Sequence, residues 1–342
     1  MKILSLFDGI SCARVALERA GIEVDVYWAS EVDKYAIQVA TNNYPSTIEL
    51  GDIKNICWDS RNKIDLLVGG SPCQDLSIAK KNRKGLNGEK SGLFWEYVRL
   101  LKETKPKYFI LENVASMSKE DKEIITKELG VEPIMINAAL VSAQNRKRLF
   151  WTNIHGVTLP KDKGILLNNI LEDCVDKKYF VNISDKYGNK GLCSINGKSK
   201  SMTAYMWKGY GNDDVTTIRV GQIGKGGQGD RIYSLSGKSV GLSALGGSRG
   251  AKTGLYHVPH GYKKEKFTQE KKYPTLHAQD PRNNHLICND IVRKLTPIEC
   301  ERLQGLSDNY TQGISNTQRY KCLGNAFNVD VVAHILSFIP NK

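Results

Sequence analysis

Long apolar runs are absent from the 342-residue chain, in which no stretch approaches the roughly 18 residues that a membrane-spanning helix needs. The eight cysteines form no CxxC pair and no Cys/His cluster at zinc spacing. Neither a disulfide framework nor a bound metal is therefore expected. The acidic Asp8 follows the start too soon for the apolar core of a signal peptide, so we expect a cytoplasmic protein. The length predicts about two domains.

Positive charge is concentrated in the middle of the chain. The net charge is +13, and residues 161–290 alone carry +9 of it together with 18 of the 31 glycines. A basic, glycine-rich segment with few helical patterns is typical of a surface that binds a polyanion. A solvated basic face without a ligand is the alternative.

Apolar periodicity over residues 1–155 predicts alternating strands and helices. The predicted strands are Ile3–Phe7, Val24–Ala29, Ile64–Val68 and Tyr108–Leu111, and the predicted helices are Ser11–Ala20, Lys34–Asn42 and Leu93–Glu103. This alternation is typical of an α/β fold with a doubly wound, mostly parallel, Rossmann-like sheet.

The alternation ends near residue 165, where short strands and glycine-rich loops are expected instead. Thr296-Pro297-Ile298-Glu299 then predicts a capped helix that closes at Gly305, and a last helix is expected over about Val329–Phe338. We therefore predict a larger domain of residues 1–165 plus 318–342. A smaller strand-and-loop domain would span residues 166–290, with 291–317 as a linking and supporting segment.

Acidic residues follow several predicted strands, at the sheet edge where open α/β folds bind ligands. Asp8-Gly9 follows the first strand, Glu31 the second, and Asp52 a third extended segment. These positions are suited to a cofactor's charged group, its ribose hydroxyls and its adenine amino group, respectively. Because surface turns are also rich in Asp and Gly, plain turn residues are the alternative.

A cysteine and a carboxylic acid follow the next two strands. Cys73 lies in Gly69-Gly70-Ser71-Pro72-Cys73-Gln74, directly after a strand, where an accessible nucleophile belongs; a small buried hydrophobe is the alternative. Glu112 ends the neighbouring strand. The cluster Gln144-Asn145-Arg146-Lys147-Arg148 is suited to bind a phosphate and to favour a thiolate, although such clusters are normally exposed and without a ligand.

Taken in order, these motifs resemble those of the DNA cytosine-5 methyltransferases over nearly the whole chain. The matching segments are Phe7-Asp8-Gly9, Glu31, Asp52, Pro72-Cys73-Gln74, Glu112-Asn113-Val114, Gln144-x-Arg146-x-Arg148, 293–300 and Gly324-Asn325. Residues 69–151 also resemble the catalytic domains of animal de novo methyltransferases, whereas 220–234 and 251–254 resemble the recognition domain of bacterial restriction-modification enzymes.

The resemblance implies methyl transfer from S-adenosylmethionine to C5 of a cytosine in a specific duplex DNA sequence. Cys73 would attack C6 of an extruded base, and Glu112, with a raised pKa, would protonate or hydrogen-bond N3. Arg146 would orient the base and a nearby phosphate, with Arg148 in support. Residues 75–92 would form a lid that closes on DNA.

The resemblance also assigns ligand contacts. Cofactor contacts are expected from Phe7, Asp8, Gly9, Ile10, Glu31, Val32, Asp52, Ile53, Pro72 and Asn325. DNA contacts are expected from Gln74, Lys80, Lys81, Arg83, Lys84, Gln228, Arg231 and Thr275, with Arg231 reading a guanine edge. The Thr-Leu pair that the family often has downstream corresponds here to Gly241-Leu242, while Thr275-Leu276 follows later.

Two other functions stay open. A tRNA cytosine-5 methyltransferase would share the catalytic motifs, and a catalytically inactive DNA-binding regulator would share the fold. The large basic insert favours duplex DNA, and the presence of Cys73, Glu112 and Arg146 favours catalysis. A monomer on DNA in the nucleoid of a bacterial or phage-infected cell is expected. A cognate restriction endonuclease would act on the same site without forming a stable complex.

Overall fold

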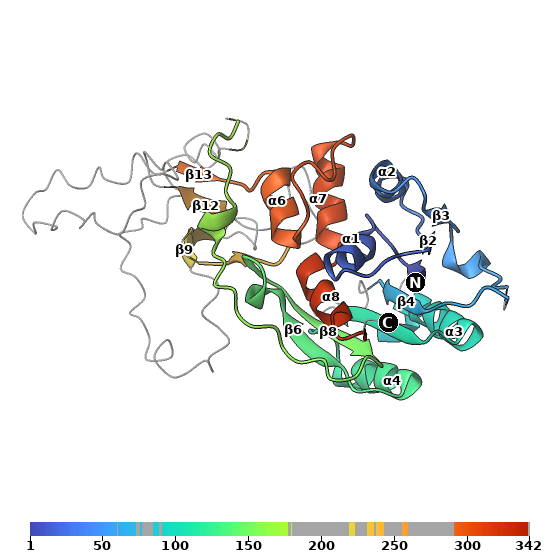
Figure 1. Ribbon diagram of the computed structural model, residues 1–342. Coiled ribbons are helices and arrows are strands. Elements are labelled where there is room, and N and C mark those ends of the chain that lie inside the picture. Colours follow the sequence, from blue (N-terminus) through green and yellow to red (C-terminus); the bar gives the residue numbers. More distant parts are fainter. Residues whose placement is uncertain are drawn as a thin grey trace, which may run out of the picture.

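The computed structural model describes residues 1–59, 61–72, 76, 85–88, 91–176, 179, 219–222, 231–235, 237–242, 255–258 and 291–340. Its central feature is a seven-stranded sheet in the order β3-β2-β1-β4-β5-β8-β6 (Figure 1). The strands are β1 Lys2–Leu6, β2 Val26–Ser30, β3 Ile48–Glu49, β4 Leu66–Gly70, β5 Tyr108–Val114, β6 Ile134–Asn137 and β8 Lys147–Thr152.

The sheet is parallel except for one strand. β3, β2, β1, β4 and β5 pair in parallel, whereas β8 runs antiparallel to both of its neighbours, β5 and β6. The strand order reverses between β1 and β4, and the carboxyl ends of these two strands therefore flank the crevice where doubly wound sheets bind ligands. The predicted α/β, mostly parallel fold is confirmed.

Both faces of the sheet are covered. Neighbouring residues in a strand point to opposite faces, so Ile3 joins one apolar core and Leu4 the other, and Leu66 and Leu67 divide in the same way. The first core holds side chains of α1 Cys12–Arg19, α2 Lys34–Asn43, α6 Pro297–Gln304, α7 Asn316–Asn325 and α8 Val329–Leu336. The second holds those of α3 Phe94–Thr104 and α4 Lys119–Leu129.

Short elements complete the described chain. A four-stranded sheet has the order β13-β12-β10-β9, and β7 pairs in parallel with β11. These strands are β9 Arg219–Gln222, β10 Arg231–Ser234, β12 Leu255–Val258, β13 Ile291–Arg293, β7 Gln144–Asn145 and β11 Ser239–Val240. The 3₁₀ turns are η1 Ile53–Asn55, η2 Gly85–Asn87, η3 Ser91–Leu93, η4 Ala138–Leu140 and η5 Leu167–Ile170. The small second sheet matches the expected strand-and-loop character, and the proposed domain boundaries stay a prediction.

Helix ends follow the local signals. Thr296 and Glu299 form the predicted capping box of α6, which closes at Gly305 with φ of 77°. Gly21 has φ of 71° directly after α1, as its position in the sequence predicts. Among the described residues, no helix is long and apolar enough to cross a membrane.

Candidate active site

A strained turn follows β1. Phe7, Gly9 and Ser11 all have left-handed backbone conformations, with φ of 56°, 63° and 59°. Between them, the carboxylate of Asp8 accepts hydrogen bonds from the hydroxyls of Ser5, Ser11 and Tyr27 at 2.5–2.6 Å. Only 5% of Asp8 is exposed, and burial raises the pKa of its carboxyl group. These buried hydrogen bonds of Asp8 therefore stabilise the turn.

Glu31 fastens this turn to the end of β2. Its Oε2 accepts the backbone N–H of Gly9 at 2.8 Å, and its Oε1 accepts those of Val32 and Asp33 at 2.7 and 2.9 Å. A Cβ added to Gly9 would meet no atom within 4 Å, so open space lies beside the turn. Asp33 in turn caps α2 through the N–H of Tyr35 and pairs with Lys321 at 2.6 Å.

An open cleft of about 250 Å³ begins at this turn. It brings together Phe7, Asp8, Gly9, Glu31, Val32, Pro72, Glu112, Arg146, Arg148 and Asn325 from the predicted set. Ile10, Asp52 and Ile53 are not among its lining residues. Ile10 and Ile53 are buried in the cores, and the Asp52 carboxylate accepts the N–H of Lys54 at the start of η1.

Other cleft residues had not been predicted. They include Asp33, Leu93, Cys322 and Phe327. Cys322 and Phe327 flank the motif Gly324-Asn325 near the C-terminus, which was the available sequence signal. Leu93 reaches the cleft from η3, and no local pattern indicates this position.

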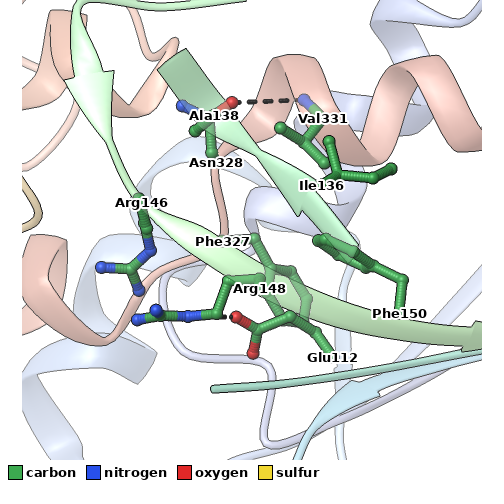
Figure 2. A pocket seen from close by; sticks show the side chains of 9 residues that line it. All are labelled: Glu112, Ile136, Ala138, Arg146, Arg148, Phe150, Phe327, Asn328 and Val331. Atoms are coloured by element: carbon green, nitrogen blue, oxygen red, sulfur yellow. Dashed lines mark hydrogen bonds and ion pairs between the residues drawn. The ribbon is translucent and has the colours of Figure 1, made fainter. Parts of the chain in front are cut away.

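Glu112 and Arg148 form an ion pair in the cleft. β5 and β8 are adjacent, and Arg148 Nε lies 2.7 Å from Glu112 Oε1 (Figure 2). Oε2 of Glu112 faces Gly70 at the end of β4, where an added Cβ would lie 3.1 Å from Oε2 and 2.6 Å from the ring of Phe327. Only glycine fits there without displacing these side chains.

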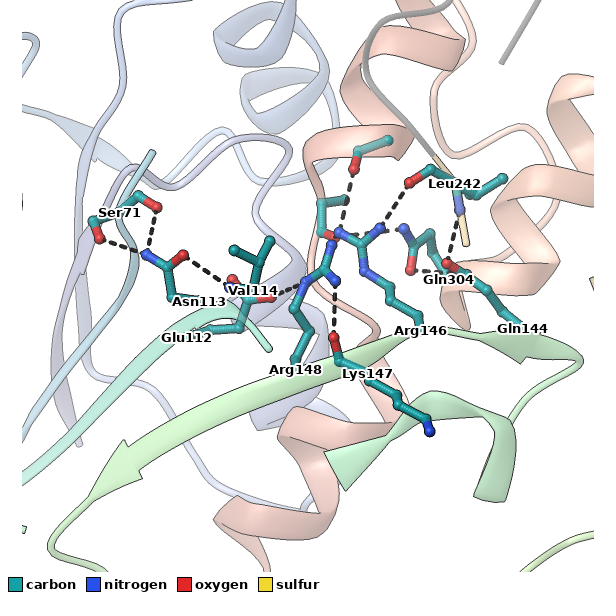
Figure 3. Close-up of polar contacts among 12 residues, drawn as sticks. Ser71, Glu112, Asn113, Val114, Gln144, Arg146, Lys147, Arg148, Leu242 and Gln304 are labelled. Atoms are coloured by element: carbon teal, nitrogen blue, oxygen red, sulfur yellow. Dashed lines mark hydrogen bonds and ion pairs between the residues drawn. The ribbon is translucent and has the colours of Figure 1, made fainter. Parts of the chain in front are cut away.

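Arg146 lies beside this pair but contacts the backbone. Its Nη1 donates to the carbonyl of Leu242 at 3.0 Å, and its Nη2 donates to those of Gly324 and Ala326 at 3.2 and 3.0 Å (Figure 3). Gln144 contacts the same segment, since its Oε1 accepts the N–H of Leu242 at 3.2 Å. Arg146 is 5% exposed and joins the segment at Leu242 to the end of α7.

Asn113 positions the residues before Cys73. Its amide donates to the carbonyl and hydroxyl oxygens of Ser71 at 3.2 and 3.0 Å (Figure 3). Ser71 and Pro72 line the cleft beside Glu112. Cys73 itself lies outside the described residues.

Of the predicted DNA contacts, only Arg231 is described. It begins β10 and is paired in register with Gln222 of β9. Gln74, Lys80, Lys81, Arg83, Lys84, Gln228 and Thr275 lie outside the described residues. In the described part of the chain, no group of three or more His, Cys, Asp or Glu side chains is placed to hold a metal ion.

Solved structures with related folds include a methyltransferase of Entamoeba histolytica, EhMeth. It has a TM-score of 0.64 and 18% identity, and the match covers 99% of this chain and 97% of that one. The Dnmt2 methyltransferase of S. pombe gives a TM-score of 0.60 at 17% identity, covering 98% and 97%. At these identities the likeness establishes the shared fold.

Sequence comparison is more specific. The type II methyltransferase M.HhaI of Haemophilus parahaemolyticus is 30% identical over 353 residues, which is 98% of this chain and 93% of the relative. The orphan methyltransferase M.SPRI of Bacillus phage SPR is 27% identical, over 98% of this chain and 96% of its own length. The family model for C-5 cytosine-specific DNA methylases matches residues 1–341. The chain therefore belongs to this family and is a DNA (cytosine-5-)-methyltransferase.

Proposed function

We propose that the protein methylates C5 of a cytosine turned out of a specific duplex DNA sequence, through a covalent bond between Cys73 and C6 of the base. The observation that carries this proposal is the Glu112–Arg148 ion pair. It lies in the same cleft as Ser71 and Pro72, the two residues that precede Cys73. The residues that lead into Cys73 and the carboxyl group of Glu112 thus lie at one end of the sheet, beside the turn after β1.

The family uses S-adenosylmethionine as its methyl donor. The described residues fit such a group, because the cleft leaves open space beside Gly9 and presents the Glu31 carboxylate, an acceptor suited to ribose hydroxyls. Phe7, Pro72 and Asn325 would contribute further contacts. When bound, the cofactor supplies an electrophilic methyl group. The contact of Asp52 with adenine is a proposal carried by the resemblance alone, because its carboxylate caps η1 and does not line the cleft.

The chain's own residues would make C5 reactive. The Cys73 thiolate forms a bond to C6, and the electron pair of the C5–C6 double bond becomes available at C5 while Glu112 hydrogen-bonds or protonates N3. After C5 is methylated, a base removes the C5 proton and the Cys73–C6 bond breaks, which restores the double bond and the thiolate. We assign the positioning of Glu112 to Arg148, because Arg148 contacts its carboxylate directly.

Arg146 is assigned a structural part from its contacts. Its guanidinium donates to three backbone carbonyls, so we propose that it holds the wall of the cleft, and its contact with the base and a nearby phosphate stays a proposal carried by the resemblance. The lid over residues 75–92 and the base-reading roles of Gln228 and Arg231 stay proposals carried by the resemblance. So do the monomeric state and a restriction endonuclease of the same specificity.

The nucleophile is tested with duplex DNA that contains 5-fluorocytosine. Fluorine cannot leave as a proton does, so the wild-type protein should form a stable adduct whose peptide contains Cys73. Cys73→Ser should abolish methyl transfer and adduct formation but retain DNA binding. Cys57→Ser, at an exposed cysteine outside the cleft, is the matched control and should behave as wild type.

Two results would contradict the proposal. Near wild-type turnover of Cys73→Ser would remove Cys73 from its role, and an adduct on another residue would reassign the nucleophile. The same assay run with tRNA separates the remaining substrate class: faster methylation of tRNA than of any duplex would exclude DNA as the principal substrate. Absence of turnover on both polymers would favour a DNA-binding regulator.

A further inference from the structure

The residues on either side of the segment that contains Cys73 are held by β5 and by α4, the next helix along the chain. At its start, Asn113 of β5 holds Ser71 through two hydrogen bonds. At its end, Asp121 of α4 accepts the N–H of Leu86 at 3.1 Å. Asn113 is the neighbour of Glu112 on β5, so the contact at Ser71 is made by the strand of the catalytic carboxylate, and the contact at Leu86 is made by the helix that follows this strand in the chain.

Asp121 is buried, and a second hydrogen bond holds its carboxylate in place. It is 9% exposed, and its Oδ2 accepts the hydroxyl of Ser118, the residue that caps α4, at 2.9 Å. Its other oxygen, Oδ1, accepts the N–H of Leu86. The Ser118 hydroxyl caps α4 by accepting the N–H of Asp121 at 3.1 Å, and this cap does not need the Oδ1 atom of Asp121. Oδ1 is therefore available to hold the backbone of Leu86.

Gly85 shows how close this approach is. Its φ is +57°, and an added Cβ would lie 2.6 Å from Asp121 Oδ1. Any other residue would be strained by its backbone conformation and would also collide with the carboxylate. The next residue, Leu86, is 4% exposed and packs into the core beside α3 and α4, which fixes the direction of the chain at this point.

We propose that Asp121 is a positioning residue for the segment that carries the nucleophile. Its carboxylate holds the backbone at Gly85 and Leu86, as Asn113 holds Ser71, and Leu76 between them is itself buried in the core. This inference rests on the proposed function, in which Cys73 must approach the base held by Glu112. A charge-assisted hydrogen bond inside the protein is strong enough to hold one arrangement of the chain in preference to others.

Three variants test the contact through methyl transfer in a single turnover at saturating DNA and cofactor. Asp121→Ala removes both oxygens and should slow transfer about ten- to hundredfold, the factor that corresponds to one buried hydrogen bond to a charged group. Asp121→Asn retains an acceptor for Leu86 and should restore most of the rate. Ser118→Ala is the matched control, since it removes the helix cap without removing the acceptor at Leu86, and should transfer at nearly the wild-type rate.

A double-mutant cycle tests the same contact if Asp121→Ala loses stability as well. Gly85→Ala should slow transfer strongly in the wild type, but much less when Asp121 is also Ala, because the carboxylate that meets the new Cβ is gone. Cofactor affinity, measured by calorimetry, should be unchanged in all variants, since none of these residues lines the cleft.

Wild-type transfer by Asp121→Ala would overturn the proposal. So would equal slowing of Asp121→Asn and Asp121→Ala, equal slowing by Ser118→Ala, or strictly additive effects of Gly85→Ala and Asp121→Ala. Failure of the wild type to form an adduct at Cys73 is a separate result. It would overturn the proposed nucleophile, while the order of the variants' transfer rates would still show whether Asp121 positions this segment.

Discussion

Glu299 is predicted to be the most sensitive single carboxylate for stability. It is fully buried, and its oxygens accept both terminal nitrogens of Arg293 at 2.8 and 2.6 Å, together with the N–H groups of Thr296 and Glu172. Arg293 is only 4% exposed. Glu299→Ala leaves the guanidinium of Arg293 buried without this counter-charge and removes half of the capping box of α6. Breaking a buried pair from one side costs about 3–5 kcal/mol.

The loss is measured by urea and thermal unfolding of the full chain. At a few degrees per kcal/mol for a protein of this size, Tm should fall by about 10 °C. Glu96→Ala is the control, because its ion pair with Arg99 is roughly one-third exposed on both sides and should be worth less than about 1 kcal/mol. Glu299→Gln keeps the shape without the charge and should lie between the two. A loss for Glu299→Ala no larger than that for Glu96→Ala would refute the reasoning.

Three further predictions concern the site. Gly70→Ala should cost about 1–3 kcal/mol by crowding Phe327 and should lower kcat in a methylation assay; unchanged kcat would show that the ring moves freely. Because burial raises the pKa of Asp8 in the folded state, the stability of the wild type falls as pH rises above the unfolded value of about 4. Asp8→Asn should therefore gain stability relative to wild type as the pH is raised from about 4, and a pH-independent difference would contradict this. Arg231→Ala should weaken cognate DNA more than scrambled DNA, whereas Lys80→Ala should weaken both and flatten the salt dependence by about 0.9 in slope; equal losses for Arg231→Ala would make it a phosphate contact.

The alternation of strands and helices could be predicted because the local spacing of apolar residues differs between the two kinds of element. The antiparallel placement of β8 between β5 and β6 could not, because it is set by pairing between distant strands. α4 was also missed: only Asp121, Ile125 and Leu129 of its residues are buried, so its apolar stripe is weak. Its ends were nevertheless marked in the sequence by Ser118, which caps it, and by Gly130, with φ of 70°.

The candidate site likewise has features that the sequence indicates and features that depend on contacts between distant residues. Glu112 and Arg148 were found because each belongs to a recognisable motif, and the structure places them in the adjacent strands β5 and β8 and pairs them. The contacts of Arg146 could not be found, since its partners Leu242 and Gly324 lie 96 and 178 positions away in the sequence. Likewise, the hydroxyl cluster around Asp8 depends on Tyr27, which only the β1–β2 pairing brings near.

Residues 237–242 pack against residues 139–146, and this contact has a consequence for protein engineering. Within the basic, glycine-rich middle of the chain, these six residues are tied to the catalytic half. β11 pairs with β7, and Lys238 is buried with its ammonium group on the carbonyls of Ala139 and Ser142. An exchange of sequence specificity with a relative should therefore be made as two separate grafts, one on each side of 237–242. A single transplanted block would have to bring residues at 238 and 242 that match Ala139, Ser142 and Arg146 of the recipient.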